Sequence, residues 1–393
     1  MNIDNPQKIK KADIIIGIPS YNEAKTIGFV VEQSSLGLKK YYPNKNSVII
    51  NLDHESPDGT KQAFLNAKKN DIPRIYISTG KNIKGKGYNF YNLFSITQKL
   101  KAKAIIVFDA DLQSIRPNWV KKMIEPIFNG YDFITPYYMR CKTDATITNH
   151  LVYPLIYGLF GWDVRQPIGG DFSFSNKMVN YWLKQKWPET AYQFGIDIFM
   201  SLGAFLSKAK TCQVNLGSKL HNLSNPKLGS MFYQVTETLF KIIASNLDKI
   251  KEVDEVDEVP ILGSKSLPIL ANAIPDEELF RSIFWDNLEC HWDLIKNIIK
   301  EPVKQKFIKD IQKKKIAIDL KIWTKIIYDF LHAYCQEDYD KPDLIKALGC
   351  LYFGRIVSFY RENGNSTPEE IEKEVVKRVK YFFKNRNYFL NKI

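Results

Sequence analysis

Residues 104–112 read AIIVFDADL, an apolar run that ends in two aspartates with one alanine between them. The first five residues predict a strand buried on both faces, because no polar residue alternates with the apolar ones. Such strands are typical of a parallel sheet that helices cover on both sides. Asp109 and Asp111 are therefore expected at the carboxyl end of a buried strand.

The same alternation of apolar runs and amphipathic stretches extends through the first 140 residues. We predict strands at residues 13–19, 47–52, 74–78, 104–108 and 133–137, and helices at 24–38, 58–70, 88–101 and 119–128. This order predicts an α/β fold with a mostly parallel sheet flanked by helices. Ligands bind such sheets at the carboxyl ends of the strands. The unusual polar clusters all fall there, at residues 20–23, 53–56, 80–87 and 109–111.

Length and composition predict a globular protein in two parts. The chain has 393 residues, of which 45% are hydrophobic and 25% charged. This suits a large catalytic domain plus a second region, which we place at residues 1–250 and 251–393. The charged stretch 251–259 is expected to form a surface loop, and the region beyond about residue 276 has a dense helical pattern.

Several classes of partner and location are disfavoured. The net charge of +13 comes from basic residues spread along the chain, and we find no nucleic-acid-binding module. The best apolar run, residues 151–162, is shorter than the about 18 residues of a membrane span and contains Pro154. The five cysteines are scattered and the N-terminus is polar. We therefore expect a cytoplasmic protein without a membrane span, a disulfide framework or nucleic acid.

The aspartate pair is the strongest chemical signal. Alternate residues of a strand face the same side, so Asp109 and Asp111 could converge where the strand frays. Two carboxylates, together with phosphate oxygens and water, suit Mg²⁺ or Mn²⁺. The competing interpretation is a pair of solvated carboxylates or a helix cap.

Two further groups carry candidate chemistry, each with a structural alternative. The stretch GKNIKGKG at residues 80–87 places Lys81, Lys84 and Lys86 among glycines, which suits phosphate binding or a solvated loop. It does not match a Walker loop, because Gly87 follows Lys86. His221 is a candidate third metal ligand if the chain folds it back to Asp111, and otherwise a structural histidine.

The remaining candidates are equally open. Asp197 is an acid in the apolar segment FGIDIF and needs a partner, functional or structural. The stretch Gly169-Gly170-Asp171 allows close backbone approach to a ligand, or forms an ordinary turn. Arg140 and Arg165 could pair with a carboxylate or phosphate, although surface arginines are commoner.

Taken together, these elements resemble a known family. IPSYNE, GKG, FDADL, QPIGGD, FGID and a late histidine follow one another in the order of the GT-A fold glycosyltransferases. The resemblance is narrower to the retaining mannosylglycerate synthase group, which includes mannosylglycerate, glucosylglycerate and mannosylglucosylglycerate synthases. It covers about residues 10–235, and RCKTDATIT at 140–148, followed by QPIGG and FGID, is its most specific part.

The resemblance implies roles for individual residues. Donor binding would involve Pro19, Tyr21, Glu23, Asp53, Lys86, Asp109 and Ala110. The metal would be held by Asp111, His221 and Asp109. Acceptor binding would involve Arg140, Asp144, Thr148, Ile168, Gly169 and Gly170. At the reaction centre the resemblance implies Asp197, Lys86 and Gly169.

The implied reaction is metal-dependent transfer of a hexose, mannose or glucose, from a nucleotide-diphosphate sugar with GDP as the expected nucleotide. The acceptor would be glycerate, 3-phosphoglycerate or glucosylglycerate, the product a compatible solute, and the protein a homo-oligomer, dimer or tetramer. The family has an Arg and a Tyr within three residues of the late histidine, where Asn222 and Ser224 stand here. The acceptor identity is therefore open.

Two other functions remain as alternatives. A sugar-phosphate nucleotidyltransferase would use a similar sheet and paired carboxylates, but its Gly-rich signature with a paired Arg and Lys is missing after Ile18. A non-catalytic regulator that binds nucleotide sugars would not require the DxD pair, GKG and late histidine to be intact together.

Overall fold

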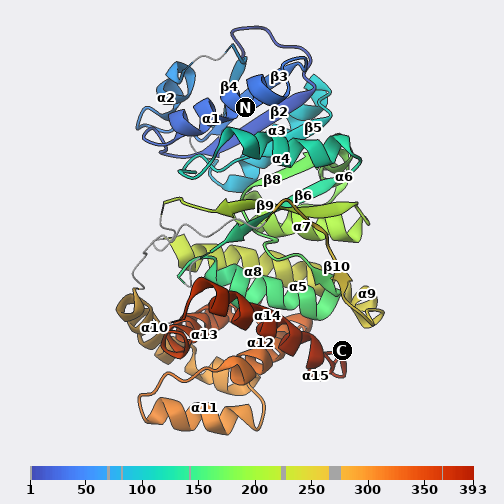
Figure 1. Ribbon diagram of the computed structural model, residues 1–393. Helices are drawn as coiled ribbons and strands as arrows, with labels where there is room; N and C mark the ends of the chain where they lie inside the picture. The colour runs from blue at the N-terminus through green and yellow to red at the C-terminus, as the bar shows by residue number, and fades with distance from the viewer. Residues whose placement is uncertain are drawn as a thin grey trace. The chain divides into compact units, whose positions relative to one another are not determined.

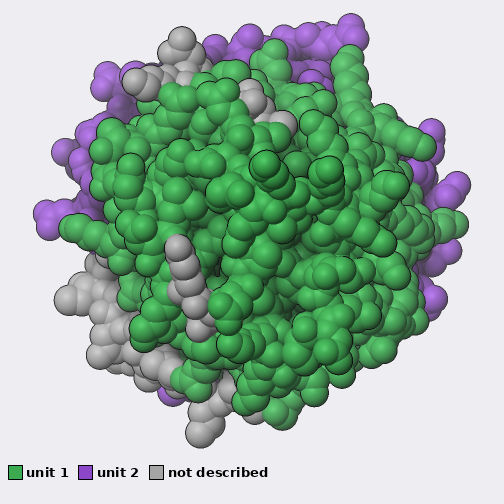
Figure 2. Space-filling view, turned by 90° about the horizontal axis from the view of Figure 1, so that it is seen from above, with its two compact units in different colours: residues 1–139, 166–226, 259–269 green, residues 140–165, 227–258, 270–393 purple. Residues whose placement is uncertain are grey.

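The computed structural model describes residues 2–68, 71–80, 83–140, 143–222, 227–264, 276–364 and 366–393. Lys81 and Ser224, discussed above, lie outside these ranges. The chain forms two compact units, coloured separately in Figure 2: residues 1–139, 166–226 and 259–269, and residues 140–165, 227–258 and 270–393. The compact units divide the chain at points other than residue 250. The domain boundary predicted there stays a prediction.

A nine-stranded sheet forms the centre of the first unit, as far as the structure describes it (Figure 1). Its strands lie in the order β1 (Asn2–Asp4), β4 (Arg74–Ser78), β3 (Ser47–Asp53), β2 (Ile14–Ser20), β5 (Ala104–Val107), β8 (Phe172–Ser175), β6 (Phe133–Met139), β9 (Thr211–Ser218) and β11 (Ile261–Leu262). The pairings among β4, β3, β2 and β5 are parallel, with Ile16 opposite Ile49 and Ile106. The predicted mostly parallel sheet is confirmed.

Helices cover both faces of this sheet. The first unit contains α1 (Ile27–Tyr41), α2 (Thr60–Asn66), α3 (Lys86–Leu100), α4 (Pro117–Phe128), α6 (Asn176–Lys184), the short η2 (Glu189–Tyr192) and α7 (Ile196–Leu206). Ile14, Ile16 and Ile18 of β2 belong to one apolar core with residues of α1 and α4. Gly17, which points to the opposite face, lies so close to Leu93 of α3 that a Cβ would come within 2.6 Å. Every residue of β2 is buried, as the apolar run predicts.

Two strands run against the parallel pattern. β1 pairs antiparallel with β4 at one edge, and β8 pairs antiparallel with both β5 and β6. The insertion of β8 brings the start of that strand to the carboxyl end of β5. This topology positions the candidate site.

Three sequence predictions are wrong in their detail. The helix predicted at residues 58–70 is shorter, because α2 ends at Asn66 and the Arg74 guanidinium binds the carbonyls that follow Ala63, including those of Phe64 and Ala67. Lys86 and Gly87 were expected in a loop but form the first turn of α3. The stretch 251–259, expected as a loop, contains β10 (Asp257–Glu258), which pairs with β7 (Trp162–Asp163).

The second unit is mainly helical. It contains η1 (Thr148–Val152), α5 (Tyr153–Phe160), α8 (Leu228–Ala244), α9 (Leu247–Lys251), α10 (Glu277–Ile298), α11 (Val303–Gln312), α12 (Leu320–Cys335), α13 (Lys341–Glu362), α14 (Pro368–Lys384) and α15 (Asn387–Leu390). The predicted helical C-terminal region is confirmed. Trp323 and Tyr352 are fully buried in it, as expected for core aromatics. No helix in the described ranges combines the length and the apolarity needed to cross a membrane.

Candidate active site

The candidate site is built where β5 runs into the FDADL stretch. The backbone N–H of Asp109 donates to the Asp171 Oδ1 at 2.9 Å, and Asp171 directly precedes β8. Because β8 runs antiparallel to β5, its first residues meet the carboxyl end of β5. The sheet topology therefore joins two aspartates that are distant in the sequence.

The Asp109 carboxylate lies between two lysine ammonium groups. Lys86 Nζ is 3.2 Å from its Oδ1, and Lys219 Nζ is 2.7 Å from its Oδ2. Lys86 comes from the first turn of α3, and Lys219 follows the last residue of β9. Burial alone would raise the pKa of Asp109, but the charges of Lys219 and Lys86 outweigh it and hold the pKa well below its usual value. Asp109 is therefore ionised at neutral pH.

Lys219 is the most completely bonded group of the site. Its Nζ contacts Asp109 Oδ2 at 2.7 Å, Asp171 Oδ2 at 2.8 Å and the Gly169 carbonyl at 2.9 Å. Its side chain is 3% exposed and that of Asp171 is fully buried. An ammonium has three hydrogens, so these contacts satisfy Lys219 completely. The stretch Gly169-Gly170-Asp171 thus holds a buried cation against Asp109.

Gly170 is required by this arrangement. Its φ is +87°, and a Cβ would lie 2.3 Å from the Asp109 Oδ2 and 2.9 Å from the Lys219 Nζ. A side chain here would meet strain from the backbone and a clash with the two charged groups. The sequence predicted that the backbone at the two glycines comes close to a ligand. In this structure the backbone of Gly170 comes close to the Asp109 carboxylate.

Asp197 also contacts Lys86. It lies in the first turn of α7, is 7% exposed, and has both oxygens 3.3 Å from the Lys86 Nζ. Burial raises the pKa of Asp197, and Lys86 opposes the rise. Burial would lower the pKa of Lys86, but Asp109, Asp197 and Asp171 raise it. Lys86 therefore stays protonated and bridges two carboxylates.

Asp111 and His221 are brought near each other by a backbone pairing. The Gln113 N–H donates to the Leu220 carbonyl at 2.8 Å, and the Asn222 N–H donates to Asp111 Oδ2 at 3.0 Å. Burial, and next the charge of Asp109, raise the pKa of Asp111, and His221 lowers it. Among the described residues no three acidic, histidine or cysteine side chains form a ready metal cluster. The metal triad Asp109, Asp111 and His221 stays a prediction.

Asp53 and Ser20 form a buried polar group at the ends of β3 and β2. Asp53 is fully buried and accepts from Ser20 Oγ at 3.1 Å, Ser56 Oγ at 2.6 Å and Tyr76 Oη at 2.8 Å. These bonds fix the turn that follows β3. The predicted donor contact of Asp53 is untested, and its carboxylate is already bonded within the protein.

A second group at this edge includes an exposed aromatic ring. Tyr21 is 37% exposed and lies edge-on to His54, with ring centroids 6.4 Å apart. Lys84 Nζ is 5.3 Å from the Tyr21 ring centroid. His54 Nδ1 contacts the Thr79 hydroxyl, and its Nε2 lies 3.0 Å from the Gly85 carbonyl. Burial lowers the pKa of His54, so this imidazole is neutral near pH 7.

Part of this chain matches a known protein family. Residues 15–181 match the family described as Glycosyl transferase family 2. This range contains β2 except Ile14, and the whole of β3, β4 and β5. It also contains Lys86, Asp109, Asp111 and Asp171. This part of the chain is therefore similar to a glycosyl transferase domain of family 2. A search of curated proteins found no match.

Solved structures with a similar chain path include glucosyl-3-phosphoglycerate synthase from Mycobacterium tuberculosis. In its complex with Mg²⁺ and UDP, it is 22% identical, with a TM-score of 0.47, and the match covers 62% of this chain and 81% of that chain. In its complex with Mn²⁺, UDP-glucose and phosphoglyceric acid the figures are the same.

The other predicted donor residues of the glycosyl transferase domain lie at the same strand ends. Pro19 is buried within β2. Glu23 accepts from the Thr26 hydroxyl at 2.8 Å. Ala110 is 3% exposed and packs into the apolar core, so only its backbone could reach a donor. These roles stay predictions.

The predicted acceptor residues belong to different compact units. Ile168, Gly169 and Gly170 lie in the first unit, whereas Arg140, Asp144 and Thr148 lie in the second, although all six fall within the matched residues 15–181. Arg140 forms an ion pair with Asp144, and Thr148 is a buried residue at the start of η1. Their shared acceptor role stays a prediction.

Sequence reasoning missed the roles of Lys219, Asp171 and His54. Lys219 stands two residues before the predicted ligand His221, and Asp171 was noted only as the end of a glycine turn. A lysine so close to a candidate ligand could have been examined as a partner for Asp109. Its contact with Asp171 depends on the antiparallel β8, which no sequence signal indicated.

Proposed function

We propose that this chain is a retaining, metal-dependent glycosyltransferase that moves a hexose from a nucleotide-diphosphate sugar to a glycerate-type acceptor in compatible-solute synthesis. The donor would carry mannose or glucose, with GDP as the expected nucleotide. The acceptor would be glycerate, 3-phosphoglycerate or glucosylglycerate. The predicted cytoplasmic location and homo-oligomeric state belong to the same proposal.

One observation carries this proposal. Lys86 bridges Asp109 and Asp197, at 3.2 and 3.3 Å, at the carboxyl end of the sheet, and Lys86 and Asp109 lie in the region that matches the glycosyl transferase family. A protonated lysine held between two carboxylates is preorganised to meet a negatively charged diphosphate. The negatively charged phosphates of the donor would then balance part of the positive charge of Lys86, which Asp109 and Asp197 balance in this structure.

The residues around Asp111 fit a divalent cation. Among the described residues Asp111 Oδ2 accepts the Asn222 N–H, and no protein group bonds its Oδ1. A carboxylate oxygen and an imidazole nitrogen, from Asp111 and His221, suit Mn²⁺ or Mg²⁺ together with diphosphate oxygens. Asp109 would contribute its charge nearby. When bound, the ion would neutralise negative charge on the diphosphate.

The transfer would proceed by a front-face route, which the resemblance implies. The bond between the anomeric carbon and the diphosphate oxygen breaks, and the acceptor hydroxyl oxygen bonds to the same face of that carbon. The hydroxyl proton passes to the departing phosphate oxygen. Lys86 would hold the leaving diphosphate by charge, and Asp197 would accept a hydrogen bond from a sugar or acceptor hydroxyl.

A donor and acceptor panel tests this function. Purified full-length protein with Mn²⁺ would be incubated with GDP-mannose, GDP-glucose, UDP-glucose or UDP-mannose, and with each of the three acceptors. We expect release of a nucleoside diphosphate only with a matching pair, and an α-configured product by NMR from an α-configured donor. Inversion at the anomeric carbon would refute the retaining mechanism.

The same assay decides between the alternatives. A nucleotidyltransferase would consume a sugar phosphate and a nucleoside triphosphate and release pyrophosphate. A non-catalytic regulator would bind a nucleotide sugar, with a measurable Kd, but release no product in any combination. Either result would overturn the proposed transfer.

A further inference from the structure

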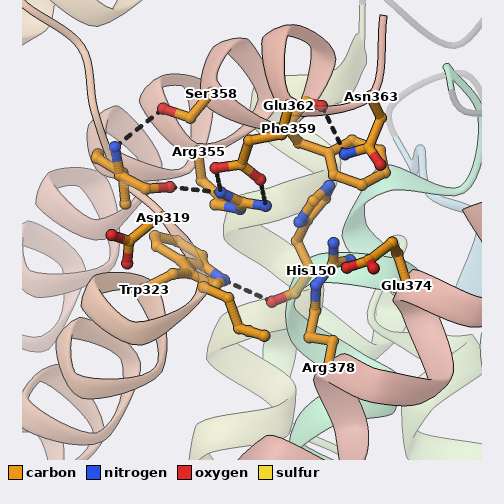
Figure 3. A network of polar contacts seen from close by, with 12 residues as sticks. His150, Asp319, Trp323, Arg355, Ser358, Phe359, Glu362, Asn363, Glu374 and Arg378 are labelled. Carbon is orange, nitrogen blue, oxygen red and sulfur yellow. Dashed lines mark hydrogen bonds and ion pairs between the residues drawn. The ribbon is translucent and has the colours of Figure 1, made fainter. Parts of the chain in front are cut away.

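The second unit holds a cluster of buried cationic and aromatic side chains around Phe359 of α13 (Figure 3). The guanidinium carbons of Arg355 and Arg378 lie 5.7 and 4.9 Å from the Phe359 ring centroid. The His150 ring is edge-on to the same ring, with centroids 4.7 Å apart. We call Arg355, Arg378 and His150 the Phe359 cluster. Figure 3 shows His150 between the two arginines.

Only one of the two arginines has a carboxylate partner. Arg355, which is 1% exposed, forms paired contacts with Glu362 at 2.9 and 2.7 Å. Arg378 is 2% exposed and donates from Nη1 to the Asn149 carbonyl at 2.7 Å. No carboxylate of the described residues lies within ion-pair distance of Arg378, although the charges of Glu362 and Glu374 act on it, and Glu374 pairs with Lys377 at 3.2 Å. This buried guanidinium therefore has no directly paired carboxylate within the described residues.

Several polar atoms of the cluster also lack hydrogen-bond partners within the described chain. These are the Nε atoms of Arg355 and Arg378 and both ring nitrogens of His150. His150 is fully buried, and burial with the charges of Arg378 and Arg355 lowers its pKa well below the usual value. The imidazole is therefore neutral, with one donor and one acceptor nitrogen.

Unpaired buried groups of this kind are costly. An arginine cannot deprotonate in a protein, so Arg378 cannot relieve its burial by losing its proton. A buried charge without a counter-charge, and buried donors without acceptors, both oppose folding. A bound anion would compensate the charge and accept from both Nε–H groups. An oxyanion that keeps one hydroxyl would also donate to the acceptor nitrogen of His150.

We propose that the Phe359 cluster is a buried binding site for one small protonated oxyanion of the hydrogenphosphate type. The Nε–H groups of Arg355 and Arg378 and the N–H of His150 donate to its oxygens. The site is anchored to η1, because Arg378 binds the Asn149 carbonyl and Trp323 Nε1 donates to the His150 carbonyl at 2.7 Å. It is independent of the proposed sugar transfer.

Crystals of the full chain provide a direct test. Arsenate has the shape and protonation of phosphate, and its arsenic scatters anomalously. We expect an anomalous peak within hydrogen-bond distance of the Arg355 and Arg378 Nε atoms after an arsenate soak, and none at that position after a bromide soak. A peak with bromide alone would overturn the oxyanion assignment. A site that stays without a peak in both soaks would overturn the proposal.

A solution test uses two arginines. Above its dissociation constant, phosphate should raise the Tm of the wild type by about 2–4 °C for each tenfold increase in concentration. Arg378→Met should abolish this rise. Arg361→Met is the matched control, because Arg361 lies in the same helix as Arg355 but is 42% exposed and pairs with Glu277 at 2.8 Å. It should keep the full rise.

The variants also separate this site from the donor site. Arg378→Met leaves Lys86 and Lys219 unchanged, so a phosphate response that persists in this variant would come from elsewhere and would contradict the proposal. If Arg378→Met does not fold, the arsenate soak of the wild type decides alone.

Discussion

At the scale of single residues, the candidate site is a chain of alternating charges. Lys86 contacts Asp197 and Asp109, and Lys219 contacts Asp109 and Asp171. Each charge is buried or half-buried beside its partners, so removing one leaves another without its counter-charge. A substitution here therefore changes both the chemistry and the stability of the domain, and the two effects need separate measurements.

Gly170→Ala should cost both activity and stability. A Cβ would lie 2.3 Å from Asp109 Oδ2 at a φ of +87°, so Asp109 must move. Gly130→Ala is the control, because Gly130 has a φ of +86° with nothing within 4 Å of its Cβ. We expect Gly130→Ala to cost about 1–2 kcal/mol of unfolding free energy and leave kcat/KM unchanged. Gly170→Ala should cost more and lower kcat/KM about 100-fold.

Equal kcat/KM values for these two variants would show that Gly170 is needed only for its backbone conformation and not to position Asp109. Urea denaturation gives the stabilities and the nucleotide-release assay the activities.

Asp197→Asn should change how stability depends on pH. Because burial raises the folded-state pKa of Asp197, the folded protein binds more protons than the unfolded chain between the two pKa values. The free energy of unfolding therefore falls as pH rises through this range. Asparagine does not titrate, so the variant should lose less stability than the wild type as pH rises from the ordinary aspartate pKa through the raised pKa of the folded state.

Urea denaturation at several pH values measures this difference. A constant gap between the two proteins would mean that Asp197 titrates in the folded state as it does in the unfolded chain.

Four residues of the candidate site were predicted from the sequence, whereas the partnership of Lys219 with Asp171 was not. Asp109, Asp111, Lys86 and Asp197 stand in short motifs beside apolar runs, and such contrast is visible locally. The Lys219–Asp171 pair joins residues far apart in the chain. Only the three-dimensional course of the strands brings these two together.

At the scale of elements, hydrophobic periodicity predicted the parallel strands and their helices well. The bounds of β4 agree to the residue, and those of β2 and β3 to within one. It failed at β8, because a strand of four residues after two glycines has no distinctive pattern and its direction depends on its neighbours. The start of α3 was also missed, since glycines at 85 and 87 favour a loop by local propensity.

The start of α3 is held against η2, and this contact should position Lys86. A Cβ on Gly87 would lie 1.9 Å from the Ala191 carbonyl, and the Gly87 N–H donates to the Gln193 carbonyl at 3.1 Å. Gly87→Ala should displace α3 and lower kcat by roughly tenfold or more. Gly28→Ala, in the first turn of α1, meets only the Ala63 carbonyl at 3.9 Å.

Gly28→Ala should keep full activity and gain about 0.5–1 kcal/mol of unfolding free energy. Unchanged kcat in Gly87→Ala would show that α3 does not need this contact to place Lys86.

At the scale of the whole molecule, the two units interleave along the chain. Residues 140–165 and 227–258 join the C-terminal helices, although 140–165 and 227–250 lie within the part predicted as the catalytic domain. The sequence alone does not show which unit a segment joins, because tertiary contacts decide this. The dense helical pattern beyond about residue 276 did predict the helical character of the C-terminal part correctly.

Divalent metal should couple nucleotide binding to global stability. With Mn²⁺ and a nucleoside diphosphate at about 100 times its Kd, unfolding should cost about 2.7 kcal/mol more, seen as a higher Tm. Chelation by EDTA should remove most of this gain. With Mn²⁺ present, Asp111→Asn should gain as little stability from the nucleotide as the wild type gains with EDTA. A gain that survives both changes would exclude Asp111 from the metal site.

The enclosure of Lys86 and Lys219 has a practical consequence for covalent labelling. Activated esters acylate neutral, accessible amines. Lys219 has all three hydrogens engaged, and the raised pKa of Lys86 keeps that amine protonated. Peptide mapping of the native protein should find both unmodified, while Lys177, with a side chain 69% exposed, is acylated. Tethering the protein to a surface through its amines should therefore spare the candidate site.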